Sequence, residues 1–206
     1  MAKDQYGPAE HYLLSKNRDR KLIIILLTLI LFSPPRVIVS QTAAQKEVAV
    51  ARDMIAERRY DSAISKLEHA LEANPNNPDA LMFMGAAVLY SEKSVPKAQK
   101  LFEQSFQAGG GAALWVSHSH EKLGTDELAD YCRGWLYLRK DGVEFAPADS
   151  DHGFRFSYSE IKELKQNRLS KLFHIKDSNK TFNFRPRSGD EGEVLLTVAL
   201  YSRFSR

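Results

Sequence analysis

A helix that stops and restarts within a few residues is the feature that most constrains this fold. The stretch AISKLEHALEANPNNPDALMFMG covers residues 63–85. In it, an amphipathic run ends before Pro75, and a second apolar run follows Asn77, which can cap a helix whose first residue is Pro78. Helices joined by so short a connection lie antiparallel to each other. We therefore predict a helical hairpin that forms one copy of a repeat.

The apolar spacing predicts four helices between residues 41 and 111. In the first, Val48, Ala51 and Ile55 recur at intervals of three and four residues, as on one face of a helix. The three glycines at 109–111 end the last helix. The starts of the second, third and fourth helices are predicted at Asp61 as an N-cap, at Pro78, and at Ser94 or Val95.

Small and large apolar residues recur along these helices at the spacing of a known motif. The signature positions are Ala63, Leu67, Ala70, Pro75, Leu81, Gly85, Ala98 and Phe102. This pattern resembles the tetratricopeptide repeat, with one repeat at residues 44–77 and another at 78–111, although the second is displaced by one residue from a period of about 34. An ordinary four-helix antiparallel bundle is the alternative interpretation.

The resemblance implies a module that binds an extended peptide or a partner helix on its concave face. Groove residues would come from the first helix of each repeat, with Arg52, Met82 and Tyr90 among the candidates. Because such solenoids need about three repeats for independent stability, something should cover the open end. The candidates are the following domain, a second copy of the chain, or a partner.

After residue 111 the apolar spacing changes toward the period of two that is typical of strands. Phe154, Phe156 and Tyr158 alternate with polar residues, and the Asp141-Gly142 pair is a strong hairpin signal. A helix near Asp190 is expected to close the chain. Its predicted buried face consists of Val194, Leu195, Val198 and Tyr201. Seven strands are predicted before it, near 114–120, 132–139, 143–146, 154–158, 161–166, 171–175 and 181–185.

This order of elements in residues 112–206 resembles a pleckstrin-homology domain, an antiparallel β-barrel covered at one end by a C-terminal helix. Another small α+β sheet is the alternative. The predicted fold class is therefore α+β, with tetratricopeptide-like repeats in residues 41–111 and the pleckstrin-homology-like domain in 112–206. The glycines at 109–111 favour a hinge between the two, unless a packed interface overrides it.

Residues 1–40 are interpreted as a signal peptide or an N-terminal membrane anchor. Eleven apolar residues at 22–32 follow a basic flank that contains Lys16, Arg18, Arg20 and Lys21. The run is short for a membrane-spanning helix, which needs about 20 residues. Since a basic flank stays cytoplasmic, residues 41–206 are expected outside the cytoplasm.

The composition excludes several classes of function. The net charge of +3 does not indicate a nucleic-acid-binding protein, and the single cysteine, Cys132, excludes an intramolecular disulfide. No nucleophile elbow, dinucleotide fingerprint or phosphate-binding loop occurs, so neither enzyme activity nor a cofactor is expected.

His118 and His120 lie two residues apart on one predicted strand and are metal-ligand candidates, with His152 and His174 as possible third ligands.

Between Arg155 and Arg187 nine Lys or Arg residues stand against three acidic ones. Such an excess can face anionic lipid headgroups.

The leading hypothesis is a non-enzymatic adaptor of the cell envelope that binds a protein partner through its repeats. The alternatives are a peripheral module that binds anionic lipid through this basic stretch, and a small metal-binding protein centred on His118 and His120.

Overall fold

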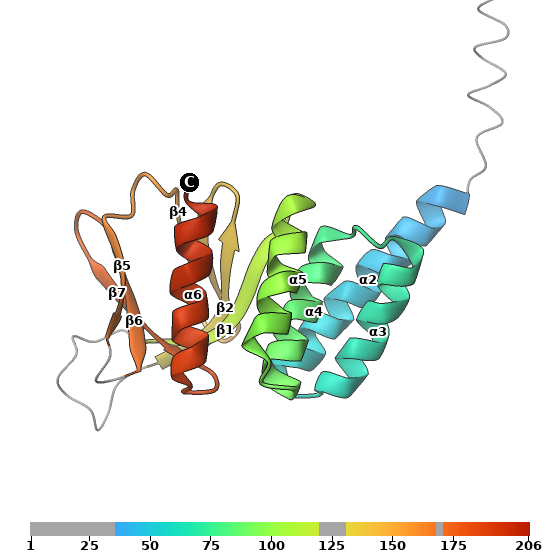
Figure 1. The fold of residues 1–206 in the computed structure, drawn as a ribbon, viewed down its shortest axis with the longest axis horizontal. Helices are drawn as coiled ribbons and strands as arrows, with labels where there is room; N and C mark the ends of the chain where they lie inside the picture. The colour runs from blue at the N-terminus through green and yellow to red at the C-terminus, as the bar shows by residue number, and fades with distance from the viewer. Residues whose placement is uncertain (1–35, 120–130, 168–170) are drawn as a thin grey trace, which may run out of the picture. The chain divides into compact units, whose positions relative to one another are not determined.

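Helical repeats, an antiparallel sheet and a final helix follow one another along the chain (Figure 1). The computed structural model describes residues 36–119, 131–167 and 171–206, and residues 41–206 form one compact unit. The predicted starts of the third and fourth helices are confirmed. The four helices are α2 (Arg36–Ala56), α3 (Tyr60–Ala73), α4 (Pro78–Ser91) and α5 (Val95–Gln107).

The seven strands form a single antiparallel sheet with the order β4-β3-β2-β1-β7-β6-β5. The predicted order of seven strands and one helix is confirmed, and it is compatible with a pleckstrin-homology-like fold. No ladder joins β4 to β5 in the described residues, so the predicted barrel is an open sheet. The elements are β1 (Gly111–Ser119), β2 (Tyr131–Arg139), β3 (Gly142–Pro147), β4 (Phe154–Phe156), β5 (Glu163–Asn167), β6 (Leu172–Lys176), β7 (Thr181–Pro186) and α6 (Glu191–Phe204).

Local sequence explains where the repeat helices begin. The Asn77 side chain accepts hydrogen bonds from the backbone N–H groups of Asp79 and Ala80, both at 3.1 Å, as an N-cap should. The prediction for Asp61 was wrong, because α3 begins at Tyr60 and its N-cap position is Arg59. Asp61 lies instead in the first turn, where its negative charge is favourable to the helix dipole.

Helix α4 is buried on every side, from Ala80 to Leu89. One side packs against α3 and α5, and another packs against β1. The Phe83 ring meets the edges of the Trp135 and Tyr137 rings on β2, with centroids 5.2 and 6.4 Å apart. A helix that is apolar all round needs neighbours on all sides. The sheet thus covers the open end of the two repeats. Of the three candidates predicted for this role, the following domain is the one that fills it.

The small residues of the repeat signature allow close helix contacts. Ala63, Ala70 and Ala98 are completely buried. Gly85 of α4 faces the Phe102 ring of α5, and a Cβ atom at position 85 would lie 2.7 Å from that ring. The predicted spacing therefore reflects the distance between the helices, because only glycine leaves room for the ring at this crossing point.

Two of the three glycines at 109–111, Gly110 and Gly111, lie in a packed junction, whereas Gly109 is exposed. The Ser105 hydroxyl donates to the carbonyl of Pro78 at 2.7 Å and accepts from the N–H of Gly111 at 3.0 Å. A Cβ atom at Gly111 would lie 2.0 Å from the carbonyl oxygen of Leu138. The expected hinge is therefore overridden by packing, since these contacts join α4, α5 and β1.

A second junction is built around the Arg187 guanidinium, which follows β7. It donates to the carbonyls of Ile55 and Ala56 at 2.6 and 2.5 Å, at the end of α2, where the last carbonyls have no partner within the helix. The same guanidinium lies over the rings of Tyr90 and Trp115, 5.6 and 5.1 Å from their centroids. One side chain therefore contacts α2, α4 and β1.

Glu193 of α6 completes this junction. Its carboxylate accepts from the Tyr90 hydroxyl at 2.9 Å, while that hydroxyl accepts from the N–H of Trp115 at 2.7 Å. The Ser188 hydroxyl and N–H also donate to Glu193. Burial raises the pKa of Glu193 above its ordinary value, and the hydrogen bonds from Ser188 and Tyr90 oppose this only partly. A buried carboxyl is thus held at the meeting point of α4, β1 and α6.

The predicted inner face of α6 was partly wrong. Leu195 is 53 % exposed, whereas Glu193 is 2 % exposed. The polar junction with Tyr90 brings Glu193 inside and turns Leu195 outward. Val194 is buried as expected, and Leu196, Leu200 and Phe204 complete the buried face.

Most of the predicted signal or anchor segment at residues 1–40 lies outside the described residues, which begin with α2 at residue 36. Among the described helices, none combines the length and the apolar character needed to cross a bilayer.

We expect Gly85→Ala to lower the free energy of unfolding by about 1–3 kcal/mol, because the added methyl group overpacks the crossing of α4 and α5. Urea denaturation measures this. Phe102→Leu in the same chain removes the ring that the methyl group would meet, so the double variant should lose less than the sum of the two single variants. Strictly additive losses would contradict this account of the crossing.

The raised pKa of Glu193 predicts a particular pH dependence of stability. A carboxyl whose pKa is higher in the folded state stabilises the fold most at low pH. It loses that contribution as the pH rises from about 4.3 through the folded pKa. Glu193→Gln keeps the shape of the side chain but does not titrate. The free energy of unfolding of the natural protein minus that of the variant should therefore fall as the pH rises; a constant or rising difference would exclude the assignment.

Candidate functional site

A groove lies between the first helices of the two repeats and strand β2. Its volume is about 250 Å³. The side chains come from three elements, so the repeats form two walls and the sheet forms the third. The lining residues are Gln45, Val48, Ala49, Arg52, Asn77, Asp79, Met82, Phe83, Tyr137 and Arg139.

Two arginines, Arg52 and Arg139, and one acidic residue, Asp79, line the groove, which leaves one positive charge in excess. Arg52 is half-buried and pairs with the neighbouring Asp53 at 2.8 Å. The Arg139 guanidinium lies over the Tyr137 ring, 4.7 Å from its centroid, and 3.9 Å from the Glu144 carboxylate. Neither arginine is buried, so both can exchange these contacts for those of a bound partner at little cost.

Tyr137 is a buried residue of the groove lining. Burial raises its pKa to about 12, against the opposing effects of Arg52 and Arg139. A tyrosine is already neutral at physiological pH, and the raised pKa keeps this phenol a hydrogen-bond donor at higher pH as well. Together with Met82 and Phe83 it provides an apolar floor beneath the two arginines.

The dimensions of the groove favour the side chains of a partner protein over a complete small molecule. Drug-sized ligands usually occupy pockets of about 300–1,000 Å³. The groove is smaller than this range, and it combines an apolar floor with a charged rim. A short segment of a partner, with one apolar and one acidic side chain, matches these features.

Two of the three residues that the sequence predicted for the groove lie in its lining. Arg52 and Met82 line the groove. The prediction that Tyr90 lines the groove was wrong. Its hydroxyl is hydrogen-bonded instead to the Glu193 carboxylate and to the N–H of Trp115. Tyr90 lies near the C-terminal end of α4, where the junction with Arg187 forms, and its position in the repeat alone does not reveal this role.

The repeat signature residues have structural roles. Ala63, Leu67, Ala70, Ala98 and Phe102 are completely buried, and Leu81 is nearly so. Gly85 is buried against Phe102, while Pro75 is exposed in the turn after α3. None of the signature residues lines the groove, so they build its walls without contacting a ligand there.

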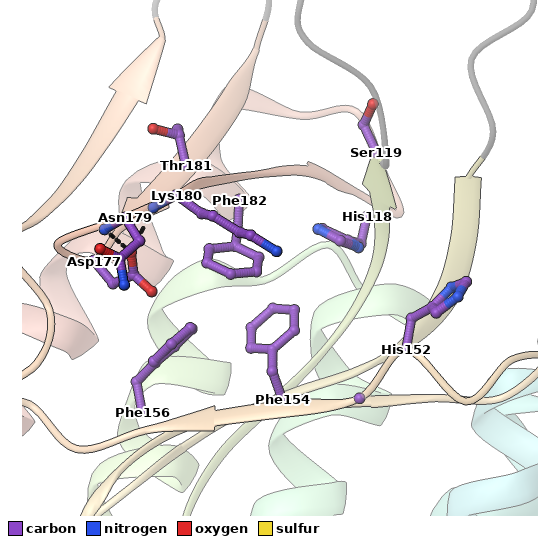
Figure 2. A pocket seen from close by; sticks show the side chains of 11 residues that line it. His118, Ser119, His152, Phe154, Phe156, Asp177, Asn179, Lys180, Thr181 and Phe182 are labelled. Atoms are coloured by element: carbon purple, nitrogen blue, oxygen red, sulfur yellow. Dashed lines mark hydrogen bonds between the residues drawn. The ribbon is translucent and has the colours of Figure 1, made fainter.

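A second, larger cavity of about 620 Å³ lies at one end of the sheet (Figure 2). It is lined by the end of β1, by β4 and the two residues before it, by the turn between β6 and β7, and by the first residues of β7. The residues are His118, Ser119, His152, Gly153, Phe154, Phe156, Asp177, Asn179, Lys180, Thr181 and Phe182.

His118 is buried in an aromatic environment at this cavity. Its ring centroid lies 5.2–5.9 Å from those of Phe145, Phe154, Phe182 and Phe184. Its Nδ1 atom is 3.6 Å from the Cys132 sulfur. Sequence reasoning missed this pair. It follows from the register of β1 and β2, in which His118 lies opposite Cys132, but the sequence does not fix that register.

The proposed metal ligands are only partly brought together. His120 lies outside the described residues. His152 lines the same cavity as His118, whereas His174 lies on β6 with its Nε2 3.5 Å from Glu163. Within residues 36–119, 131–167 and 171–206, no three His, Cys, Asp or Glu side chains are placed to hold one metal ion.

The basic stretch is divided among several roles. Arg155 pairs with Asp141, and Lys165 pairs with Glu163. Arg187 is committed to the end of α2. Arg168 lies outside the described residues. The nine basic residues between 155 and 187 therefore do not all face solvent as one cationic surface.

Comparison with known proteins bears directly on the helical part. The family model described as Tetratricopeptide repeat matches residues 54–115. The predicted resemblance is confirmed. The matched region runs from the end of α2 into β1 and includes the second helix of each repeat. It covers less than half of the chain, and no curated protein matches the chain.

Two solved structures are similar to parts of the chain. One is the N-terminal pleckstrin-homology domain of human ARAP2, with a TM-score of 0.37, 12 % identity, and coverage of 45 % of this chain and 76 % of that domain. The other is the C-terminal domain of an unknown protein from Leishmania infantum, with a TM-score of 0.34, 18 % identity, and coverage of 52 % and 98 %. At these TM-scores, the functional argument rests on the chain's own residues.

Proposed function

We propose that this chain is a non-enzymatic adaptor that binds a segment of a partner protein in the groove of its tetratricopeptide-like repeats. The observation that carries the proposal is the position of the groove. It lies on the first helices of both repeats, where this family of repeats provides a binding surface, and its floor and rim suit a peptide.

The contacts define the expected mode of binding. An apolar side chain of the partner would pack on Met82 and Phe83, and an acidic side chain would pair with Arg52 or Arg139. The Tyr137 hydroxyl adds a donor between these two regions. Because the side chains of the floor are already packed, binding requires little ordering of the groove, which favours affinity.

We also propose that the adaptor works at the cell envelope, with residues 41–206 outside the cytoplasm. The support is the apolar run at 22–32 behind its basic flank. The intact mass of the mature protein distinguishes a cleaved signal from an uncleaved anchor. A full-length product that fractionates with the cytoplasm would contradict both.

Site-specific crosslinking tests the groove. A photo-crosslinking amino acid in place of Ala49, which is exposed and lines the groove, should capture one dominant partner from the native source. The same group in place of Lys100, which is exposed on α5 outside the groove, should not capture it. Equal capture from both positions would contradict the proposed site.

Once the partner is known, we expect Arg52→Ala to weaken its binding about fivefold, because an ion pair at the rim is worth about 1 kcal/mol. Calorimetric titration measures this. Arg59→Ala is the matched control, since Arg59 forms a similar surface pair with Glu57 and lies outside the groove. Equal affinities of the two variants would argue against recognition by Arg52.

A further inference from the structure

The cavity at the end of the sheet has an aromatic floor. The rings of Phe154, Phe156 and Phe182 form a closed triangle, with centroid distances of 4.4, 5.2 and 5.1 Å. All three side chains are half-buried, so part of each remains accessible. Figure 2 shows these three rings clustered together in the lining of the cavity. Accessible aromatic surface in a concave site favours an apolar ligand, because burying that surface releases about 25 cal/mol per Å².

One flexible cation, Lys180, lies at the rim. Figure 2 shows its side chain extending from the turn toward the aromatic rings. In the described residues, no carboxylate lies within ion-pair distance of its ammonium group. The Lys180 backbone is fixed, because its N–H and that of Asn179 each donate to Asp177 Oδ1 at 2.6 Å. The turn therefore holds the lysine at the cavity, where its charge also acts on the nearby Asp177 without forming an ion pair.

The charge balance limits the kind of anion that can bind. Asp177 also lines the cavity, and the two backbone N–H groups lower the pKa of its carboxyl, which keeps it ionised. The single Lys180 ammonium group can pair with one anionic group, and the neighbouring Asp177 carboxylate disfavours any further negative charge. A polyphosphate headgroup would meet repulsion from Asp177 and an apolar floor that cannot satisfy its oxygens.

We propose that this cavity binds a small amphiphilic acid, a molecule with an apolar body and a single anionic group. The apolar body packs on Phe154, Phe156 and Phe182, and the anionic group pairs with Lys180. The cavity volume of about 620 Å³ suits a ligand of this class. This site is distinct from the groove of the repeats and does not depend on the proposed adaptor function.

Two fluorescent probes test the proposal on the full chain. Anilinonaphthalene sulfonate has an aromatic body and one anionic group, and N-phenylnaphthylamine has the same ring system without the acid. The anionic probe should bind saturably and more tightly than the neutral one. High salt should lower the affinity for the anionic probe and leave the affinity for the neutral probe unchanged. Absence of saturable binding of the anionic probe, or equal affinity for both probes, would overturn the proposal.

Variants assign the binding to the cavity. Lys180→Met should weaken binding of the anionic probe about fivefold and leave the neutral probe unchanged. Lys176→Met is the matched control, because Lys176 is exposed on β6 and does not line the cavity. Phe156→Ala should weaken both probes, with thermal melting as a check on folding. Equal effects of Lys176→Met and Lys180→Met on the anionic probe would place the binding elsewhere.

Displacement identifies the source of the ligand. Dodecanoate represents a fatty acid, and naphthoate represents an aromatic acid. Displacement of the anionic probe by either acid supports the proposal. The acid that displaces it at the lower concentration shows whether the cavity prefers an aliphatic or an aromatic ligand. Displacement by inositol hexaphosphate but by neither acid would overturn it, because it would indicate a polyanion site.

Discussion

The burial of α4 on all sides is the constraint on which the rest of this structure depends. A helix with apolar residues around its whole circumference cannot be stable with one face in water, and two repeats alone leave such a face open. Here the sheet covers it through the contacts of Phe83 with Trp135 and Tyr137. The repeats and the sheet therefore share one core, and a groove walled by both has a defined shape.

Much of the helical part could be predicted because its determinants are local. Asn77 caps α4 through its own side chain, and the spacing of small residues such as Gly85 reflects a contact between neighbouring helices. The errors arose where a distant contact overrides a local preference. Glu193 suits the first turn of an exposed helix, yet it is buried because Tyr90, more than a hundred positions earlier in the chain, donates to it.

The candidate sites were less predictable, because both combine residues from separate elements. Arg52 and Met82 could be expected in the groove from the repeat resemblance, whereas Tyr137 and Arg139 enter it only because the sheet packs on the repeats. The cavity at the end of the sheet unites β1, β4 and β7. Its position depends on strand order and curvature, which a period of two in the sequence does not specify.

The shared core is tested most directly by unfolding the protein in denaturant while following two signals. Tryptophan fluorescence reports on the sheet, since Trp115 and Trp135 lie on β1 and β2, and far-ultraviolet circular dichroism reports mainly on the helices. Because α4 packs against both the other helices and the sheet, the two signals should follow a single coincident transition. Two separate transitions, with the sheet or the repeats unfolding first, would contradict the shared core.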